Sequence, residues 1–172
     1  MLKILFLFII SISAIADTFI VQSHNSNINF SVDKFLFIGV DGKFTKFKGK
    51  IIVDNNIVTA INGIVDVNSV NTDNQRRDKD LKAEGYFNAS QHKYIDFKAI
   101  AVDDKELEAT ITIKGITKKI KFNIDEMKLT DTKLTIKISS VIIREEFMLN
   151  GSLSSVISNE VKVSATLQAY IQ

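Results

Sequence analysis

Residues 107–124, which read LEATITIKGITKKIKFNI, decide the fold. Up to residue 113 the apolar residues occupy odd positions and polar residues lie between them, whereas after Gly115 the apolar residues fall on even positions. Alternation of this kind is typical of a β-strand whose two faces meet different environments. Because the parity changes across the turn, both apolar sets point to the same side. The stretch predicts a β-hairpin with an apolar face that another part of the protein, or a ligand, must cover.

The same alternation recurs along most of the chain, and residues that favour turns lie between the alternating runs. The runs cover residues 28–32, 61–67, 95–99, 134–138 and 161–167, and the turn residues are at 54–56, 103–104 and 150–151. We count eight or nine strands with no linker between them. Gly39, Gly42 and Gly49 favour the bulges and corners that a closing sheet needs. The sequence predicts one antiparallel all-β domain.

One segment, residues 72–85, lacks alternation and is strongly polar. Thr72 followed by Gln75 has the spacing of a capping box, and Gly85 is placed to end a helix. A helix this polar cannot be a core element, and we expect it to lie over one end of the barrel that the closing sheet would form. The alternative is a solvated loop.

The first sixteen residues have the pattern of a cleaved signal peptide. Lys3 precedes an apolar run, and the segment closes with Ala14, Ile15 and Ala16, the small-x-small pattern that signal peptidase reads. The run is too short for a transmembrane anchor, which needs roughly 20 residues. We expect export, a mature chain that starts at Asp17, a single domain over residues 17–172 and no integral membrane segment after cleavage.

Composition excludes several classes of function. Without cysteine the chain has neither disulfides nor thiolate metal sites. Cleavage would remove one of the 22 basic residues and leave 21 against 20 acidic ones, interleaved along the chain, which argues against nucleic-acid binding. The two histidines, His24 and His92, lack a third partner for a catalytic zinc, and no G-x-S-x-G motif is present. We therefore expect no catalytic residue, metal or cofactor.

Five motifs in order resemble the YceI-like family of periplasmic lipid-binding proteins, also called the polyisoprenoid-binding family, across essentially the whole mature region. They are Ser26, Ile28, Phe30 and Val32; Val40, Gly42, Phe44, Phe47 and Gly49; Thr72, Arg77, Asp78, Leu81 and Phe87; Ile111 to Lys118; and Ile142, Arg144 and Phe147 followed by Ser158, Glu160 and Val161. Each motif is weak alone, but five in order with matching spacing are a strong signal.

The resemblance implies an eight-stranded, lipocalin-like antiparallel barrel with one short helix over an end. Its interior would hold a long-chain isoprenoid or a fatty-acid-like amphiphile, which makes the chain a periplasmic carrier or reservoir. The residues permit this independently, because a barrel of about eight strands either fills with its own side chains or holds one small ligand. Lipid needs no hydrogen bond to bind there, since each buried methylene contributes about 0.8 kcal/mol.

The predicted ligand-binding residues are the inward apolar positions of the strands and two arginines from the family motifs. They are Phe30, Val32, Phe44, Phe47, Val65, Val67, Arg77, Phe97, Ile111, Ile113, Phe122, Ile136, Ile138 and Arg144. For each apolar position, ordinary core packing is about as good an explanation as ligand contact. Arg77 and Arg144 could hold a phosphate or carboxylate head group. We favour the rival, structural role, with an Asp78–Arg144 ion pair as the example.

Two other classes of function stay open at this point. A barrel filled by its own side chains would be a non-carrier binding module that engages another envelope protein. An enzyme acting on a sequestered lipid would require folding to gather His24, His92 and scattered carboxylates. The sequence does not decide the oligomeric state, a dimer included, nor the identity of the lipid.

Overall fold

Strands make up most of the protein. The computed structural model describes residues 16–35, 38–103 and 105–172, so the predicted signal peptide lies outside the described residues except for Ala16. The strands are β1 (Asp17–Val21), β2 (Asn27–Lys34), β3 (Ile38–Phe44), β4 (Phe47–Asp54), β5 (Ile57–Asp66), β6 (Val70–Asn71), β7 (Tyr94–Val102), β8 (Glu106–Ile113), β9 (Ile116–Leu129), β10 (Lys133–Ile143) and β11 (Ile157–Ile171). The helices are α1 (Gln75–Lys82) and the 3-10 turns η1 (Ser23–Asn25), η2 (Val67–Ser69), η3 (Arg144–Phe147) and η4 (Ser154–Val156).

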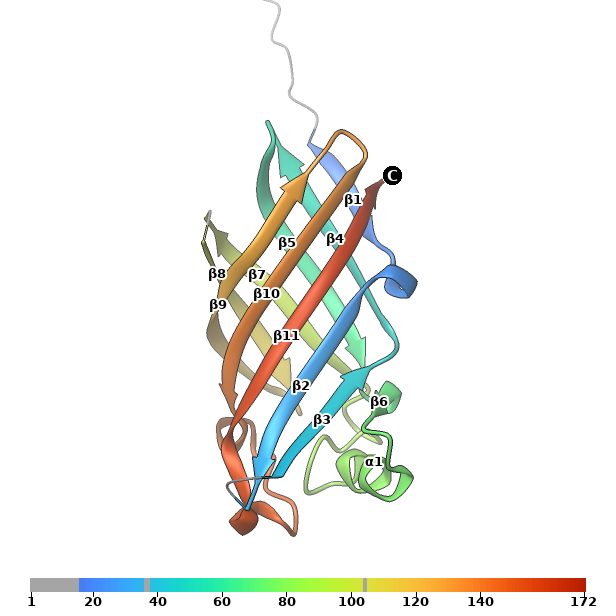
Figure 1. Cartoon of the computed structure of the whole chain (residues 1–172), viewed down its shortest axis with the longest axis vertical. Helices are drawn as coiled ribbons and strands as arrows, with labels where there is room; N and C mark the ends of the chain where they lie inside the picture. Colours follow the sequence, from blue (N-terminus) through green and yellow to red (C-terminus); the bar gives the residue numbers. More distant parts are fainter. Residues whose placement is uncertain (1–15, 36–37, 104) are drawn as a thin grey trace, which may run out of the picture.

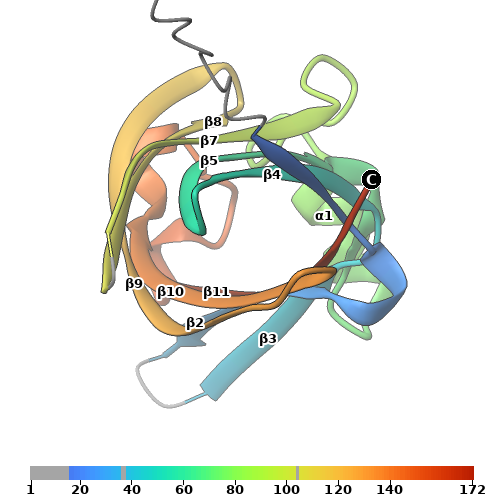
Figure 2. The same ribbon diagram turned by 90° about the horizontal axis from the view of Figure 1, so that it is seen from above.

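The sheet closes on itself as an antiparallel barrel (Figures 1 and 2). Its wall runs in the order β1-β4-β5-β7-β8-β9-β10-β11, and the pairing of β11 with β1 closes the ring. β2 continues the line of β1 after the η1 turn and pairs with the other half of β11, while β3 continues the line of β4. The wall therefore has eight strand positions, which confirms the predicted fold class.

The hairpin that decided the fold is formed by β8 and β9. Ile113 pairs with Ile116, so only Lys114 and Gly115 make the turn. Both have positive φ, at 52° and 76°, as the two central residues of a type I′ turn require. The odd positions of β8 from Leu107 to Ile113 are buried against the interior. The predicted hairpin is confirmed, and the parity change puts both apolar faces inside the barrel.

One side of the barrel departs from regular pairing where β3 meets β4. The corner at Thr45 and Lys46 is held by the buried Ser69: the amide of Thr45 donates to the Ser69 carbonyl at 3.2 Å, and the amide of Lys46 to its hydroxyl at 3.0 Å. Beyond this corner β5 no longer pairs with the strand, and the neighbour of β3 is the two-residue β6. The wall is thus incomplete at this end, where the chain continues from β6 into α1 (Figure 1).

The predicted helix exists, but its predicted boundaries were wrong. It begins after Asn74, whose side chain accepts a hydrogen bond from the amide of Arg77 at 3.0 Å, so Asn74 and not Thr72 is the N-cap. It ends at Lys82, before Gly85. A Cβ on Gly85 would lie 3.0 Å from the Cα of Gly151, so this glycine permits close approach of two loops instead of ending the helix.

Candidate functional site: an apolar cavity open at one end

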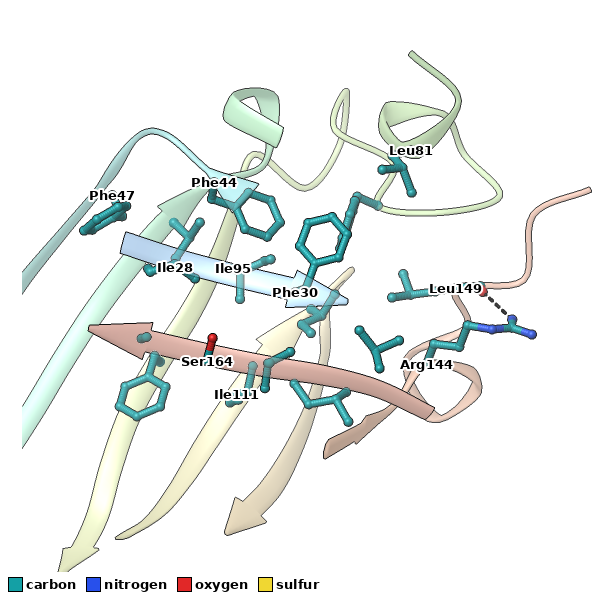
Figure 3. A pocket seen from close by; sticks show the side chains of 18 of the residues that line it. Ile28, Phe30, Phe44, Phe47, Leu81, Ile95, Ile111, Arg144, Leu149 and Ser164 are labelled. Carbon is teal, nitrogen blue, oxygen red and sulfur yellow. Dashed lines mark hydrogen bonds between the residues drawn. The ribbon is translucent and has the colours of Figure 1, made fainter. Parts of the chain in front are cut away.

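The barrel contains a cavity of about 570 Å³ with a mainly apolar lining (Figure 3). Twelve of the predicted residues line it: Phe30, Val32, Phe44, Phe47, Val65, Arg77, Phe97, Ile111, Ile113, Phe122, Ile138 and Arg144. The volume falls within the range of about 300 to 1,000 Å³ that small-molecule sites occupy. The strand alternation that builds the barrel therefore also brings most of the predicted residues to one space.

The cavity ends part-way along the barrel, and the remaining interior is filled by side chains. On β11 the inward residues from Ile157 to Leu167 line the cavity, but Ala169 does not and is fully buried. On β10 the change falls between Ile138, which lines the cavity, and Ile136, which is 0% exposed and does not. Phe19 and Ile51 are in the same packed layer, paired across β1 and β4. This packed layer closes the hollow at one end. The two chain termini of the described structure lie at the same end (Figure 1).

Two predicted residues lie outside the cavity lining. Ile136 belongs to the packed end just described. Val67 is 1% exposed and lies in the η2 turn, where the chain has left the regular wall after β5. Both are core residues, which is the alternative that the sequence had left open for each apolar position.

Aromatic rings cluster near the open end. Phe44 lies between Phe30 and Phe87, with ring centroids 5.7 Å and 5.8 Å away. Phe30 lies against Gly42 of the paired strand, where an added Cβ would come within 2.2 Å of its ring. Edge and tilted arrangements are the ones that aromatic rings prefer, and each ring buries a large apolar area. Gly42 is thus needed for the position of Phe30 in the cavity wall.

The mouth of the cavity is built from segments that strand alternation could not reveal. Leu81 of α1, Phe87 after it, and Leu149 and Leu153 before η4 all line the cavity. The segment after α1 and the segment before η4 meet where the Tyr86 ring packs on Gly151. A Cβ on Gly151 would come within 2.1 Å of two atoms of that ring. Phe87 and Leu81 were recognisable only as parts of a family motif, and Leu149 and Leu153 carried no signal in the sequence.

Arg144 is a structural residue, although it borders the cavity. It is 5% exposed, and its guanidinium donates to the carbonyls of Leu149, Ser154, Ile157 and Ser158 at 2.8 to 3.2 Å. Figure 3 shows the bond to Leu149. The predicted ion pair with Asp78 was wrong: the carboxylate near Arg144 is that of Glu145, at 3.6 Å. Arg144 therefore fixes the η3–η4 segment, which forms one side of the mouth.

Asp78 instead joins Arg77 and Thr72 in a cluster that ties the helix to β6. The amide and hydroxyl of Thr72 donate to Asp78 Oδ1 at 2.8 and 2.6 Å. Arg77 donates from Nε to the Thr72 hydroxyl at 2.9 Å and from Nη2 to its carbonyl at 2.7 Å. These bonds hold the half-buried guanidinium of Arg77 at the cavity mouth.

Charge at the mouth is predominantly positive. Lys34, Arg76 and Arg77 line this end, with Asp80 as the acidic residue among them. The shifted carboxyl groups lie elsewhere. Hydrogen bonds from Lys128 and Lys137 lower the pKa of Glu126 to about 2, and backbone amides of Glu106 and Lys105 lower the pKa of Asp103. Neither residue borders the cavity, so these carboxyl groups do not contribute to the site.

The histidines do not assemble a reactive centre in the described part of the chain. His24 lies in the exposed η1 turn, and His92 packs against the β8–β9 turn near Gly115. No group of three or more metal-ligating side chains is found among residues 16–35, 38–103 and 105–172. In the same residues, no helix has the length and apolar character to cross a membrane.

Comparison with known proteins identifies the family. The family model described as "YceI-like domain" matches residues 19–169. The chain belongs to the YceI-like family. This confirms the resemblance that the sequence motifs had indicated.

Curated relatives in this family are distant. A UPF0312 protein of Vibrio cholerae is 29% identical over 108 residues, a match that covers 59% of this chain and 57% of the relative. The chain thus matches somewhat more than half the length of that relative. A UPF0312 protein of Staphylococcus aureus strain USA300 is 25% identical over 134 residues, covering 73% of this chain and 78% of the relative.

Solved structures share the fold at low sequence identity. BcnA of Burkholderia cenocepacia superposes with a TM-score of 0.77 at 18% identity, covering 86% of this chain and 98% of that one. A polyisoprenoid binding domain from Saccharophagus degradans, implicated in plant cell wall breakdown, gives a TM-score of 0.70 at 17% identity, covering 93% and 100%. Both structures share the barrel fold of this chain.

Proposed function

We propose that the protein is a periplasmic carrier or reservoir for one long-chain isoprenoid or fatty-acid-like amphiphile. The single observation that carries the proposal is an apolar cavity that is closed at one end and open at the other. An amphiphile in such a space places its tail toward the packed layer of Phe19, Ile51 and Ile136 and its head group at the mouth. The signal-peptide pattern of residues 1–16 and the membership of the family support export to the periplasm.

The cavity volume matches a single tail. A volume of about 570 Å³ lies within the ~300 to 1,000 Å³ range of small-molecule pockets, so one acyl or prenyl tail has room inside. At about 0.8 kcal/mol for each buried methylene, burial of ten of them contributes about 8 kcal/mol. This offsets much of the entropic cost of association, which is about 4 to 15 kcal/mol.

Arg77 is the candidate for head-group contact. Its guanidinium lines the mouth and is oriented by Thr72, and a guanidinium binds carboxylate or phosphate through paired hydrogen bonds. Arg144 takes the structural role, because backbone carbonyls occupy its donors. Binding needs no catalytic group, and we propose a binding protein instead of an enzyme.

The test is native mass spectrometry of the protein purified without detergent, followed by organic extraction. We expect a co-purifying lipid of one chain, and uptake of a fluorescent acyl or prenyl probe after the lipid is removed. An Arg77→Gln variant should lose affinity for an acyl acid and keep its affinity for the matching alcohol. A lipid-free spectrum together with no uptake of either probe would refute the carrier proposal.

A further inference from the structure

Four large apolar side chains are exposed at the open end of the barrel, and we refer to them as the apolar rim: Phe35 (53% exposed), Ile38 (57%), Met148 (62%) and Leu153 (45%). They belong to two adjoining segments. The amide of Phe35 donates to the carbonyl of Val156 at 2.8 Å, and the amide of Val156 donates to the carbonyl of Leu153 at 3.1 Å. The β2–β3 end and the η3–η4 segment therefore lie side by side (Figure 1).

Neither the local backbone nor the core explains why these residues are apolar. Phe35 and Met148 have φ values of 52° and 53°, in the left-handed region, which glycine and asparagine adopt with less strain. Both side chains are more than half exposed, so neither gains core packing in return. Large apolar residues at two left-handed, solvent-facing positions indicate that this surface is covered by something outside the chain.

The apolar rim is continuous with the cavity. Leu153 belongs to both, since it lines the cavity and is also exposed. Lys34 and Leu149, the direct neighbours of Phe35 and Met148, line the cavity as well. A tail that leaves the cavity through the mouth would therefore pass along the apolar rim.

Basic residues of β2 and α1 lie beside the apolar rim, while η3, next to Met148, carries the exposed Glu145 and Glu146. Lys34 Nζ lies 5.0 Å from the centre of the Phe35 ring, and α1 at the same end carries four basic residues and two acidic ones. Of those two, Asp78 is engaged by Thr72 within the protein. Aromatic and aliphatic side chains flanked by lysine and arginine are typical of surfaces that insert into the interface of an anionic membrane.

We propose that the apolar rim docks on a lipid bilayer that contains anionic phospholipid, so that a tail moves between bilayer and cavity without crossing water. This inference rests on the proposed lipid-carrier function and adds where the protein meets its lipid source. Phe35 and Ile38 enter the interface, and the basic residues of α1 contact the phosphates. A second copy of the chain is the rival occupant, and the experiment distinguishes the two.

The experiment is flotation of the full mature chain with vesicles of equimolar phosphatidylcholine and phosphatidylglycerol, with pure phosphatidylcholine vesicles in parallel. Wild type should float with the mixed vesicles and more weakly with the neutral ones. Phe35→Ser and Ile38→Ser should each lower the vesicle partition coefficient about tenfold or more, because each removes a large apolar side chain from the interface. The matched control is Ile57→Ser, since Ile57 is 64% exposed at the opposite end of the barrel and should change nothing.

Probe uptake from solution separates this inference from the proposed function. The Phe35→Ser and Ile38→Ser variants should still take up a dissolved acyl probe, because neither residue lines the cavity. Flotation of Phe35→Ser and Ile38→Ser equal to that of wild type, or an equal loss with Ile57→Ser, would refute docking. A wild type that ignores vesicles but forms a dimer broken by Phe35→Ser would assign the apolar rim to a second copy. Flotation without any uptake would leave docking in place and remove the carrier function.

Discussion

Replacing Ala165 with phenylalanine should abolish lipid binding while leaving the protein folded. Ala165 is on β11, paired with Ile28 of β2 and Ile138 of β10, and all three residues line the cavity. A phenyl ring at this position projects into empty space instead of into packed atoms. It would occupy the room of roughly five methylene groups of a bound tail, which is about 4 kcal/mol of lost burial or close to a thousandfold weaker affinity.

The matched control is Ala169→Phe. Ala169 follows Ala165 along β11 and lies on the same face of the strand. Ala169 is 0% exposed and lies in the packed layer, paired with Val21 and Leu134. A ring forced in there should lower the free energy of unfolding by about 1 to 3 kcal/mol, as overpacking of a filled core does. The two variants make the same chemical change on the same face of one strand, so they separate hollow from core.

The assay combines titration of delipidated protein with a fluorescent acyl probe and urea unfolding followed by circular dichroism. We expect Ala165→Phe to lose probe binding with an unchanged unfolding midpoint, and Ala169→Phe to unfold at lower urea. Wild-type affinity in Ala165→Phe, or a loss of stability equal to that of Ala169→Phe, would refute a hollow interior at this position.

Three further variants test the surroundings of the cavity. Arg144→Met should lower the free energy of unfolding by about 3 kcal/mol or more in urea titrations, because several buried carbonyls lose their donor. Asn74→Ala should cost about 1 kcal/mol in the same assay by removing the cap of α1. Lys128 and Lys137 lower the pKa of Glu126 from 4.5 to about 2. The contribution of Glu126 to stability is therefore complete above pH 4.5 and is lost as the pH falls toward 2. Carboxyl titration by NMR measures this pKa, and Lys137→Met should raise it.

The control for Arg144→Met is an exposed arginine. Arg76→Met removes an exposed arginine of α1 at the mouth and should leave stability within about 0.5 kcal/mol of wild type. If Arg144→Met were equally mild, the carbonyl contacts would not hold the η3–η4 segment. A Glu126 that titrates at its ordinary value would contradict the two lysine contacts, and an unchanged Asn74→Ala would contradict its role as cap.

The strands were predictable because each one has one face toward water and one toward the interior, so that polar and apolar residues alternate along its sequence. The hairpin of residues 107–124 is the clearest case, down to the Lys114–Gly115 turn. Alternation cannot distinguish a lined hollow from a packed core, since both require apolar residues. Ile136 and Ile138 show this: they are two residues apart on one face, yet only Ile138 borders the cavity.

The mouth was less predictable, because its contacts involve the backbone and close approach of loops. Arg144 binds carbonyl oxygens, which every residue has, so no acceptor could be identified from side-chain types. The same limit applied to Thr72, which has the spacing of a capping box but binds Asp78, while Asn74 caps the helix. Gly151 was predicted only as a turn residue, and its fit against Tyr86 depends on tertiary structure.

The layer formed by Phe19, Ile51 and Ile136 gives the hollow a floor, and a floor allows length to be measured. A tail shorter than the distance from floor to mouth leaves its head group below the guanidinium of Arg77, and a longer one pushes the head group past it. Discrimination between chain lengths then needs no polar contact along the tail. Replacing one side chain of this layer with a smaller or larger one would shift the preferred tail length without altering any group that touches the head group.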